Sequence, residues 1–157
     1  MTETPRNTPE NPAASCTKGM TAPDDAQRAA IFEKIRLNQC QWPIQIKLVL
    51  PNAPYFDRAK LLIAADCCAF ACKDFHSRCR EGSVTLIGCP KLDGVDYSEK
   101  LTAIIAGNDI ESVSVARMEV PCCSGLEGAV RKALENSGKP ISCHVVTISI
   151  NGEIIVG

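Results

Sequence analysis

Apolar and polar positions along the chain predict strands separated by helices. Residues 44–50 (IQIKLVL) alternate between apolar and polar side chains, and residues 59–66 (AKLLIAAD) form an almost continuous apolar run. Alternation is typical of a half-buried strand, and a short apolar run is typical of a strand buried on both faces. Runs of strand type also occupy residues 83–88, 111–120 and 143–150. The pattern therefore predicts five strands.

Helical patterns lie between these strands, at residues 68–82, 96–109 and 125–140. Strands that alternate with helices indicate βαβ units and a parallel sheet. Asn151-Gly152 is a strong hairpin signal, so residues 153–157 are expected to return antiparallel. The sequence predicts one α/β domain of the flavodoxin or Rossmann-like type. It has a mainly parallel sheet of about five strands, helices on both faces and a C-terminal β-hairpin.

The N-terminal part of the chain has a different composition. Residues 1–23 are rich in Pro, Thr, Asn and Glu, and we expect a flexible tail there. Thr21 and Asp24 have capping-box spacing before an amphipathic pattern, which predicts a helix over 24–37. The folded domain is therefore assigned to 24–157. The N-terminus has no apolar segment of the secretory type, so a cytoplasmic location is expected.

Composition narrows the classes of function. The 157 residues carry a net charge of −1, which gives no reason to expect nucleic acid or an anionic membrane as a partner. No apolar run approaches the roughly 20 residues of a transmembrane helix. Ten cysteines are many for this length. Because cytosolic thiols stay reduced, metal binding, redox chemistry or simple burial explains them better than disulfides.

Five of the cysteines directly follow predicted strands. Cys67 and Cys68 follow the second strand, Cys89 follows the third, and Cys122 and Cys123 follow the fourth. The carboxyl ends of parallel strands meet at one edge of a sheet, which is where open α/β sheets bind ligands. The pattern therefore predicts a shared metal or cluster site. The following helix N-terminus would favour the thiolate form.

The remaining cysteines and the histidines have simpler interpretations. The chain has no C-x-x-C motif, so neither a standard zinc site nor a thioredoxin-like motif is indicated. His76 is read as a polar helix residue, with a ligand or proton carrier as the alternative. His144 is read as structural. Four cysteines are read as small buried residues: Cys40, Cys72, Cys79 and Cys143.

Four segments carry a resemblance to a known family. They are QWPIQIKLVLPNAPYF, LLIAADCCAFACKDFH, LIGCPKLDGVDYSEKL and VARMEVPCCSGL. They resemble a family of uncharacterised iron–sulfur cluster-binding proteins from anaerobic bacteria and archaea, over roughly Gln41 to Leu134. Most members also have an N-terminal two-cluster ferredoxin module, which this sequence lacks. The resemblance therefore covers the C-terminal domain only.

The resemblance implies a set of ligands. Cys67, Cys89, Cys122 and Cys123 match the family's motif positions, as does His76. Cys16, in SCTKGM, stands where the family has a C-G-C-P-G-S segment, and the family's C-C-G is Cys122-Cys123-Ser124 here. Three further thiols look like additions that would bind a second metal ion or enlarge the cluster: Cys68, Cys72 and Cys79.

The resulting hypothesis is a cysteine-ligated iron–sulfur cluster, of the 4Fe–4S type, that acts in electron transfer or redox chemistry. A separate ferredoxin or another redox protein is the expected partner, and a homodimer is considered as well. Two alternatives stay open. One is a cluster carrier, maturation factor or redox sensor, and the other is a non-enzymatic module with zinc or structural thiols. The sequence identifies no catalytic residue.

Overall fold

The computed structural model describes residues 24, 26 and 41–156, which contain a five-stranded sheet. The strand order is β2-β1-β3-β4-β5, with the first four strands parallel and β5 antiparallel to β4. Five strands make up the sheet: β1 (Ala59–Ala65), β2 (Val84–Gly88), β3 (Ile110–Met118), β4 (Cys143–Ile148) and β5 (Ile154–Val156).

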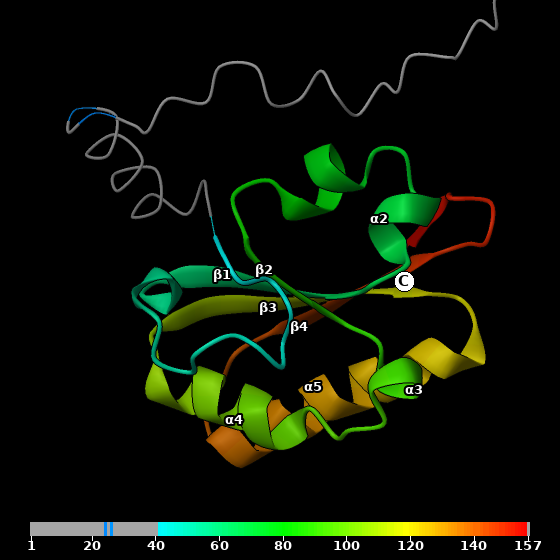
Figure 1. The fold of residues 1–157 in the computed structure, drawn as a ribbon. Helices are drawn as coiled ribbons and strands as arrows, with labels where there is room; N and C mark the ends of the chain where they lie inside the picture. Colours follow the sequence, from blue (N-terminus) through cyan, green and yellow to red (C-terminus); the bar gives the residue numbers. More distant parts are fainter. Residues whose placement is uncertain (1–23, 25, 27–40, 157) are drawn as a thin grey trace, which may run out of the picture.

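Helices cover both faces of the sheet. Figure 1 shows α3, α4 and α5 beneath the sheet and α2 above it. The α-helices are α2 (Cys68–Ala71), α3 (Pro90–Asp93), α4 (Ser98–Gly107) and α5 (Ser124–Ser137). The shorter turns are η2 (Pro54–Phe56), η3 (the π-helix His76–Arg80) and η4 (Pro121–Cys123). Within this part of the chain, no helix is long and apolar enough to span a membrane.

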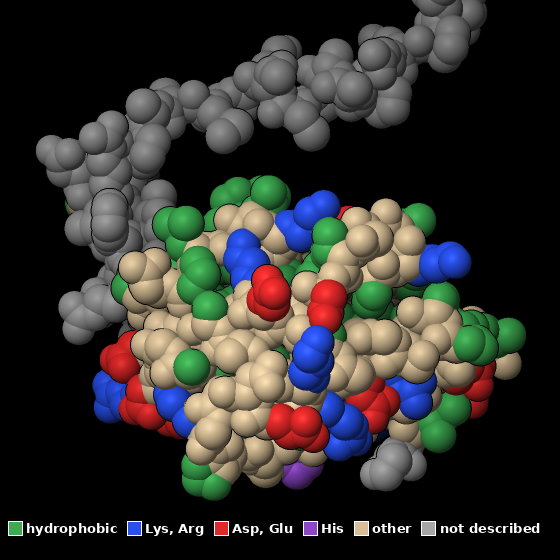
Figure 2. Space-filling model, turned by 90° about the horizontal axis from the view of Figure 1, so that it is seen from below, with side chains coloured by type: hydrophobic (Ala, Val, Ile, Leu, Met, Phe, Trp, Pro, Cys, Tyr) green, Lys and Arg blue, Asp and Glu red, His purple; other side chains and the backbone are tan. Residues whose placement is uncertain are grey.

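The core lies between the sheet and these helices. All residues of β1 except Lys60 are buried, as expected of a central parallel strand. From below, α4 contributes Leu101, Ile104 and Ile105, which are fully buried and share one face of the helix because they lie three or four positions apart. Figure 2 shows the molecule from this helical side, where basic and acidic side chains are interspersed. The outward surface of the helical layer therefore carries charges of both signs.

The predicted fold class is confirmed, but the first predicted strand is wrong. Residues 44–50 form turns, with only an isolated parallel bridge from Gln45 to Ile87 at the edge of β2. The amides of Leu48 and Val49 both donate to the Gln45 carbonyl. Ile46 and Val49 are buried while Leu48 is exposed, so the buried positions lie three apart. A spacing of three positions is typical of a helical turn, although the sequence of residues 44–50 also fits the apolar–polar alternation of a strand.

The helix predicted over 68–82 is interrupted. It divides into α2 and η3, because Cys72 adopts an extended conformation at the end of α2. The short helix α3 was not predicted; it begins at Pro90, whose fixed φ suits the first turn of a helix. The predicted tail over 1–23 lies outside the described residues, as does the helix predicted over 24–37 apart from positions 24 and 26.

Candidate functional site

The carboxyl ends of the parallel strands lie along one edge of the sheet. Ala65 of β1 pairs with Gly88 of β2, and Met118 of β3 pairs with Ile148 of β4. From β1 the chain passes to β2 on one side, and from β2 it crosses back to β3 on the other side. The strand order therefore reverses between β1 and β3. Such a switch point opens the crevice in which α/β sheets bind their ligands.

Two pairs of adjacent cysteines occupy this switch point. Cys67 and Cys68 follow β1, while Cys122 and Cys123 lie in η4, just after β3. Cys67 and Cys122 are exposed, whereas Cys68 is 0% exposed and Cys123 is 5% exposed. The two loops thus bring four thiols together at this edge, two at the surface and two in the core.

These thiols influence one another electrostatically. Cys68 interacts with Cys67 and Cys123, while Cys123 also interacts with Cys67 and with its neighbour Cys122. Burial raises the pKa of Cys68 to about 12 and also raises the pKa of Cys123. Burial disfavours a charged thiolate, so both core thiols are protonated at neutral pH.

Cys89 lies on the neighbouring loop of the same edge. It is half-buried and precedes α3, directly after β2 ends at Gly88. Pro90 packs beside the start of α5, since a Cβ built on Gly125 would lie 3.6 Å from the Pro90 Cβ. The Cys89 loop therefore adjoins the helix that follows Cys122 and Cys123.

The other sequence candidates differ in how they are placed relative to this group. Cys72 is buried at the end of α2 and interacts with the half-buried Cys79 of η3, which also interacts with Cys68. His76 is exposed, and its ring contacts Phe75 edge-on at 5.7 Å between centroids. Cys143 begins β4 and so lies at the opposite edge of the sheet. Cys16 and Cys40 are outside the described residues.

The thiols do not form a closed cage for a single ion. Among residues 24, 26 and 41–156, no three His, Cys, Asp or Glu side chains are arranged to hold a metal ion. One zinc ion requires sulfur or nitrogen donors within about 2.0–2.3 Å of a common point. The structure therefore shows a gathered set of thiols without this geometry.

A polar network missed by sequence reasoning lies beside the thiols. Tyr97 is 2% exposed, and its hydroxyl donates a hydrogen bond to Asp93. Asp66, between β1 and Cys67, accepts a hydrogen bond from the Gln45 side chain at 3.5 Å. Burial raises the pKa of both Asp66 and Tyr97. The only sequence signal was the Asp-Cys dipeptide, and carboxylates at strand ends are too common to be diagnostic.

Glu119 connects the edge to the C-terminal hairpin. Its carboxylate accepts a hydrogen bond from the Ile150 amide at 2.7 Å. Gly152, at the turn of the hairpin, lies so close to α2 that an added Cβ would clash with the Ala71 carbonyl oxygen. The hairpin thus packs on α2, and the loops after β1, β3 and β4 support one another.

Comparison with known proteins agrees with this topology. Residues 53–157 match the Rossmann-like domain family. The chain belongs to this family. An uncharacterised protein of Archaeoglobus fulgidus is 37% identical over 115 residues, which are 73% of this chain and 81% of that protein. No solved structure gives a significant match.

Membership of the Rossmann-like family defines the fold and leaves the ligand open. Dinucleotide-binding members of this fold have glycines in the first βα turn, which let the pyrophosphate approach the backbone. Here that turn reads Asp66-Cys67-Cys68-Ala69 and contains no glycine. A ligand at this switch point would therefore meet thiols where a dinucleotide would need bare backbone.

Proposed function

We propose that this Rossmann-like domain binds an iron–sulfur cluster, of the 4Fe–4S type, at the carboxyl edge of its sheet. The ligands would be Cys67, Cys89 and one or both of Cys122 and Cys123. Cys16, the other candidate, lies outside the described residues. The observation that carries the proposal is the meeting of thiols from separate strand-end loops at the switch point.

The donor set suits a cluster in its chemistry. Cysteine thiolates are the standard ligands of iron–sulfur clusters. A cluster is itself several atoms across, so its ligands stand further apart than the donors around one ion. The two exposed thiols, Cys67 and Cys122, can be reached from solvent without any change in the core. Cys89 is followed by a proline, as cluster ligands often are.

The surrounding residues would shape the environment of the bound group. The helix α5 begins directly after Cys123, and its first N–H groups favour nearby negative charge. The interaction of Glu119 with the hairpin and the packing of Gly152 on α2 hold the neighbouring loops in place. A bound cluster would supply one-electron transfer, and a separate ferredoxin or other redox protein is the partner we propose.

Anaerobic reconstitution of the full chain with iron and sulfide tests the proposal. We expect brown protein with broad visible absorption and equal amounts of iron and sulfide. Substitution of Cys67, Cys89 or Cys122 by Ser should reduce both contents. Cys143→Ser is the control, because this half-buried thiol lies at the opposite edge. Colourless protein that carries one zinc ion and no sulfide would contradict the proposal.

A second candidate, a cluster carrier, is favoured by the exposure of Cys67 and Cys122. Exposed ligands allow an acceptor's thiols to attack the cluster directly. Transfer of the cluster to an apo-ferredoxin should then be faster than loss of its iron to a chelator in the same solution. If the reconstituted protein exchanges electrons reversibly and transfers no cluster, the electron-transfer function is the correct one.

A further inference from the structure

The four thiols at the switch point form two layers. We call Cys67 and Cys122 the outer thiols, because both are exposed, and Cys68 and Cys123 the inner thiols, because both are buried in the core. Each outer thiol is followed directly in the sequence by its inner neighbour. The same arrangement therefore occurs on two loops that follow different strands.

The inner thiols connect these two loops. The Cys68 thiol interacts with the backbone of Ala65 at the end of β1, and the Cys123 thiol interacts with the backbone of Met118 at the end of β3. Cys68 and Cys123 also interact with each other. Because both belong to the hydrophobic core, protein atoms already surround their sulfurs. A cluster several atoms across cannot reach either sulfur unless the core opens.

We infer that Cys68 and Cys123 are positioning residues rather than ligands, and that the packing of their side chains in the core fixes the separation of the ligands Cys67 and Cys122 across the switch point. This inference rests on the proposed cluster. It selects Cys122 over Cys123 within the Cys-Cys pair. It also gives a structural role to Cys68, which sequence reasoning had read as an addition.

Cys123 has a further effect on its neighbour. Its thiol interacts with the Cys122 side chain. A ligated Cys122 would be a thiolate, which only accepts, so in this contact the S–H of Cys123 would donate. Hydrogen bonds to ligand sulfurs stabilise the more negative, reduced cluster and raise its reduction potential. Removal of this donor should lower the potential without removing the cluster.

Matched valine variants at adjacent positions test the inference. Cys67→Val and Cys122→Val remove exposed thiols, while Cys68→Val and Cys123→Val replace core thiols with an apolar side chain that packs and does not ligate. After anaerobic reconstitution, we expect the outer variants to lose most of their iron and sulfide. The inner variants should retain wild-type contents, with circular dichroism confirming the fold of all four.

Reduction potentials test the additional effect of the Cys123 thiol on Cys122. Cys123→Val should have a lower potential than wild type, and Cys123→Ser, which keeps a donor, should restore it. Loss of iron from folded Cys123→Val as complete as that from Cys122→Val would overturn the inference while leaving the proposed function in place. If Cys123→Val does not fold, the iron content of folded Cys123→Ser decides: wild-type content supports the inference, and a loss as complete as that from Cys122→Val overturns it. Wild-type protein that takes up neither iron nor sulfide would overturn both.

Discussion

Gly88 illustrates how a single residue shapes this edge of the sheet. It ends β2, and the Tyr97 ring lies directly against its backbone. A Cβ at this position would lie 2.6 Å from the Tyr97 hydroxyl oxygen and 2.8 Å from Cζ of the ring. The absence of a side chain therefore lets Tyr97 reach Asp93 beside the thiol loops.

Substitution of Gly88 by Ala should destabilise the protein. The Tyr97 ring must move within a packed core, and such overpacking costs about 1–3 kcal/mol in the free energy of unfolding. Gly128→Ala is the control, because this α5 position has no atom within 4 Å of the added methyl. That change should stabilise the helix by roughly 0.5–1 kcal/mol. Urea unfolding followed by circular dichroism measures both, and equal stabilities would contradict the packing argument.

At the scale of elements, a side chain protects the edge of β2. Gln41 is buried and forms two hydrogen bonds with Thr85, donating to its carbonyl and accepting from its amide, both at 2.7 Å. Residues 44 and 46 then pair with Ile87 through their backbones. The amide of Gln41 thus takes the place of a peptide group, and the edge of β2 is paired without a sixth strand.

Gln41→Ala should therefore expose this edge. The Thr85 amide and carbonyl lose their partners, which costs about 1–3 kcal/mol in the free energy of unfolding. Gln41→Glu is the matched variant: its carboxylate can accept from the amide but cannot donate to the carbonyl. Chemical denaturation measures stability, and hydrogen exchange at Thr85 measures local protection. A wild-type exchange rate at Thr85 in Gln41→Ala would rule out this role, whereas Gln41→Glu should keep the amide protected and lose stability only through the unpaired Thr85 carbonyl.

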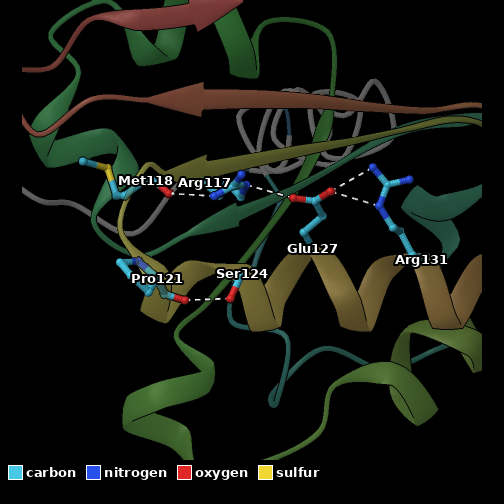
Figure 3. A network of polar contacts seen from close by, with 6 residues as sticks. All are labelled: Arg117, Met118, Pro121, Ser124, Glu127 and Arg131. Atoms are coloured by element: carbon cyan, nitrogen blue, oxygen red, sulfur yellow. Dashed lines mark hydrogen bonds and ion pairs between the residues drawn. The ribbon is translucent and has the colours of Figure 1, made fainter. Parts of the chain in front are cut away.

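An ion network fixes α5 on β3 (Figure 3). Glu127 pairs with Arg117 of β3 at 2.9 Å and with Arg131, one turn along α5, at 2.8 Å. The Arg117 and Glu127 side chains are 24% and 21% exposed, whereas Arg131 is 56% exposed. Arg117 also donates to the Met118 carbonyl at the end of β3. The network therefore sets the position of α5 next to the thiol loops.

Neutralising the shared acid should be costly. Glu127→Gln leaves Arg117 partly buried without a counter-charge, and hydrogen bonds to charged groups contribute about 1.5–3 kcal/mol. Arg131→Gln breaks only the exposed pair and should cost less than about 1 kcal/mol. Thermal unfolding of the two variants measures the difference. A larger loss of stability in Arg131→Gln than in Glu127→Gln would contradict this prediction, because it would make the exposed ion pair the more important one.

At the scale of the whole molecule, the buried side chains of Cys68 and Tyr97 make the free energy of unfolding depend on pH in the alkaline range. The folded-state pKa of Cys68 is about 12, against an ordinary value of 9.0. Between these values the unfolded chain loses this proton and the folded chain keeps it. Unfolding then releases a proton, so the free energy of unfolding falls as pH rises. The raised pKa of Tyr97 acts in the same direction.

We therefore expect stability to decline from about pH 9 to pH 12, by at most about 1.4 kcal/mol per pH unit for each such group. In Cys68→Val the free energy of unfolding should decline less steeply, because valine has no proton to lose in this pH range. Urea unfolding at a series of alkaline pH values gives the slopes directly. Identical slopes in wild type and Cys68→Val would show that the thiol already titrates normally in the folded protein.

The sequence predicted some elements of this fold better than others, because the hydrophobic pattern is clear in long elements and ambiguous in short ones. Long apolar runs such as residues 59–66 and the periodic positions of α5 were read correctly, because burial in a parallel sheet or against one helix face leaves a direct mark. Residues 44–50 were misread, because alternation in seven residues fits both an edge strand and a turn. The break between α2 and η3 left no clear mark, since residues 68–82 contain good helix formers.

By itself, the sequence determined the α/β class, the parallel strands and the presence of cysteines after three of them, because these depend on local periodicity and chain order. Only the tertiary structure decided which thiols face solvent and which face the core. Cys67 and Cys68 differ by one position, as do Cys122 and Cys123, and no pattern of residue types separates them. Their burial depends on how α2 and α5 pack beside the switch point, and that packing arises from contacts distant in the sequence.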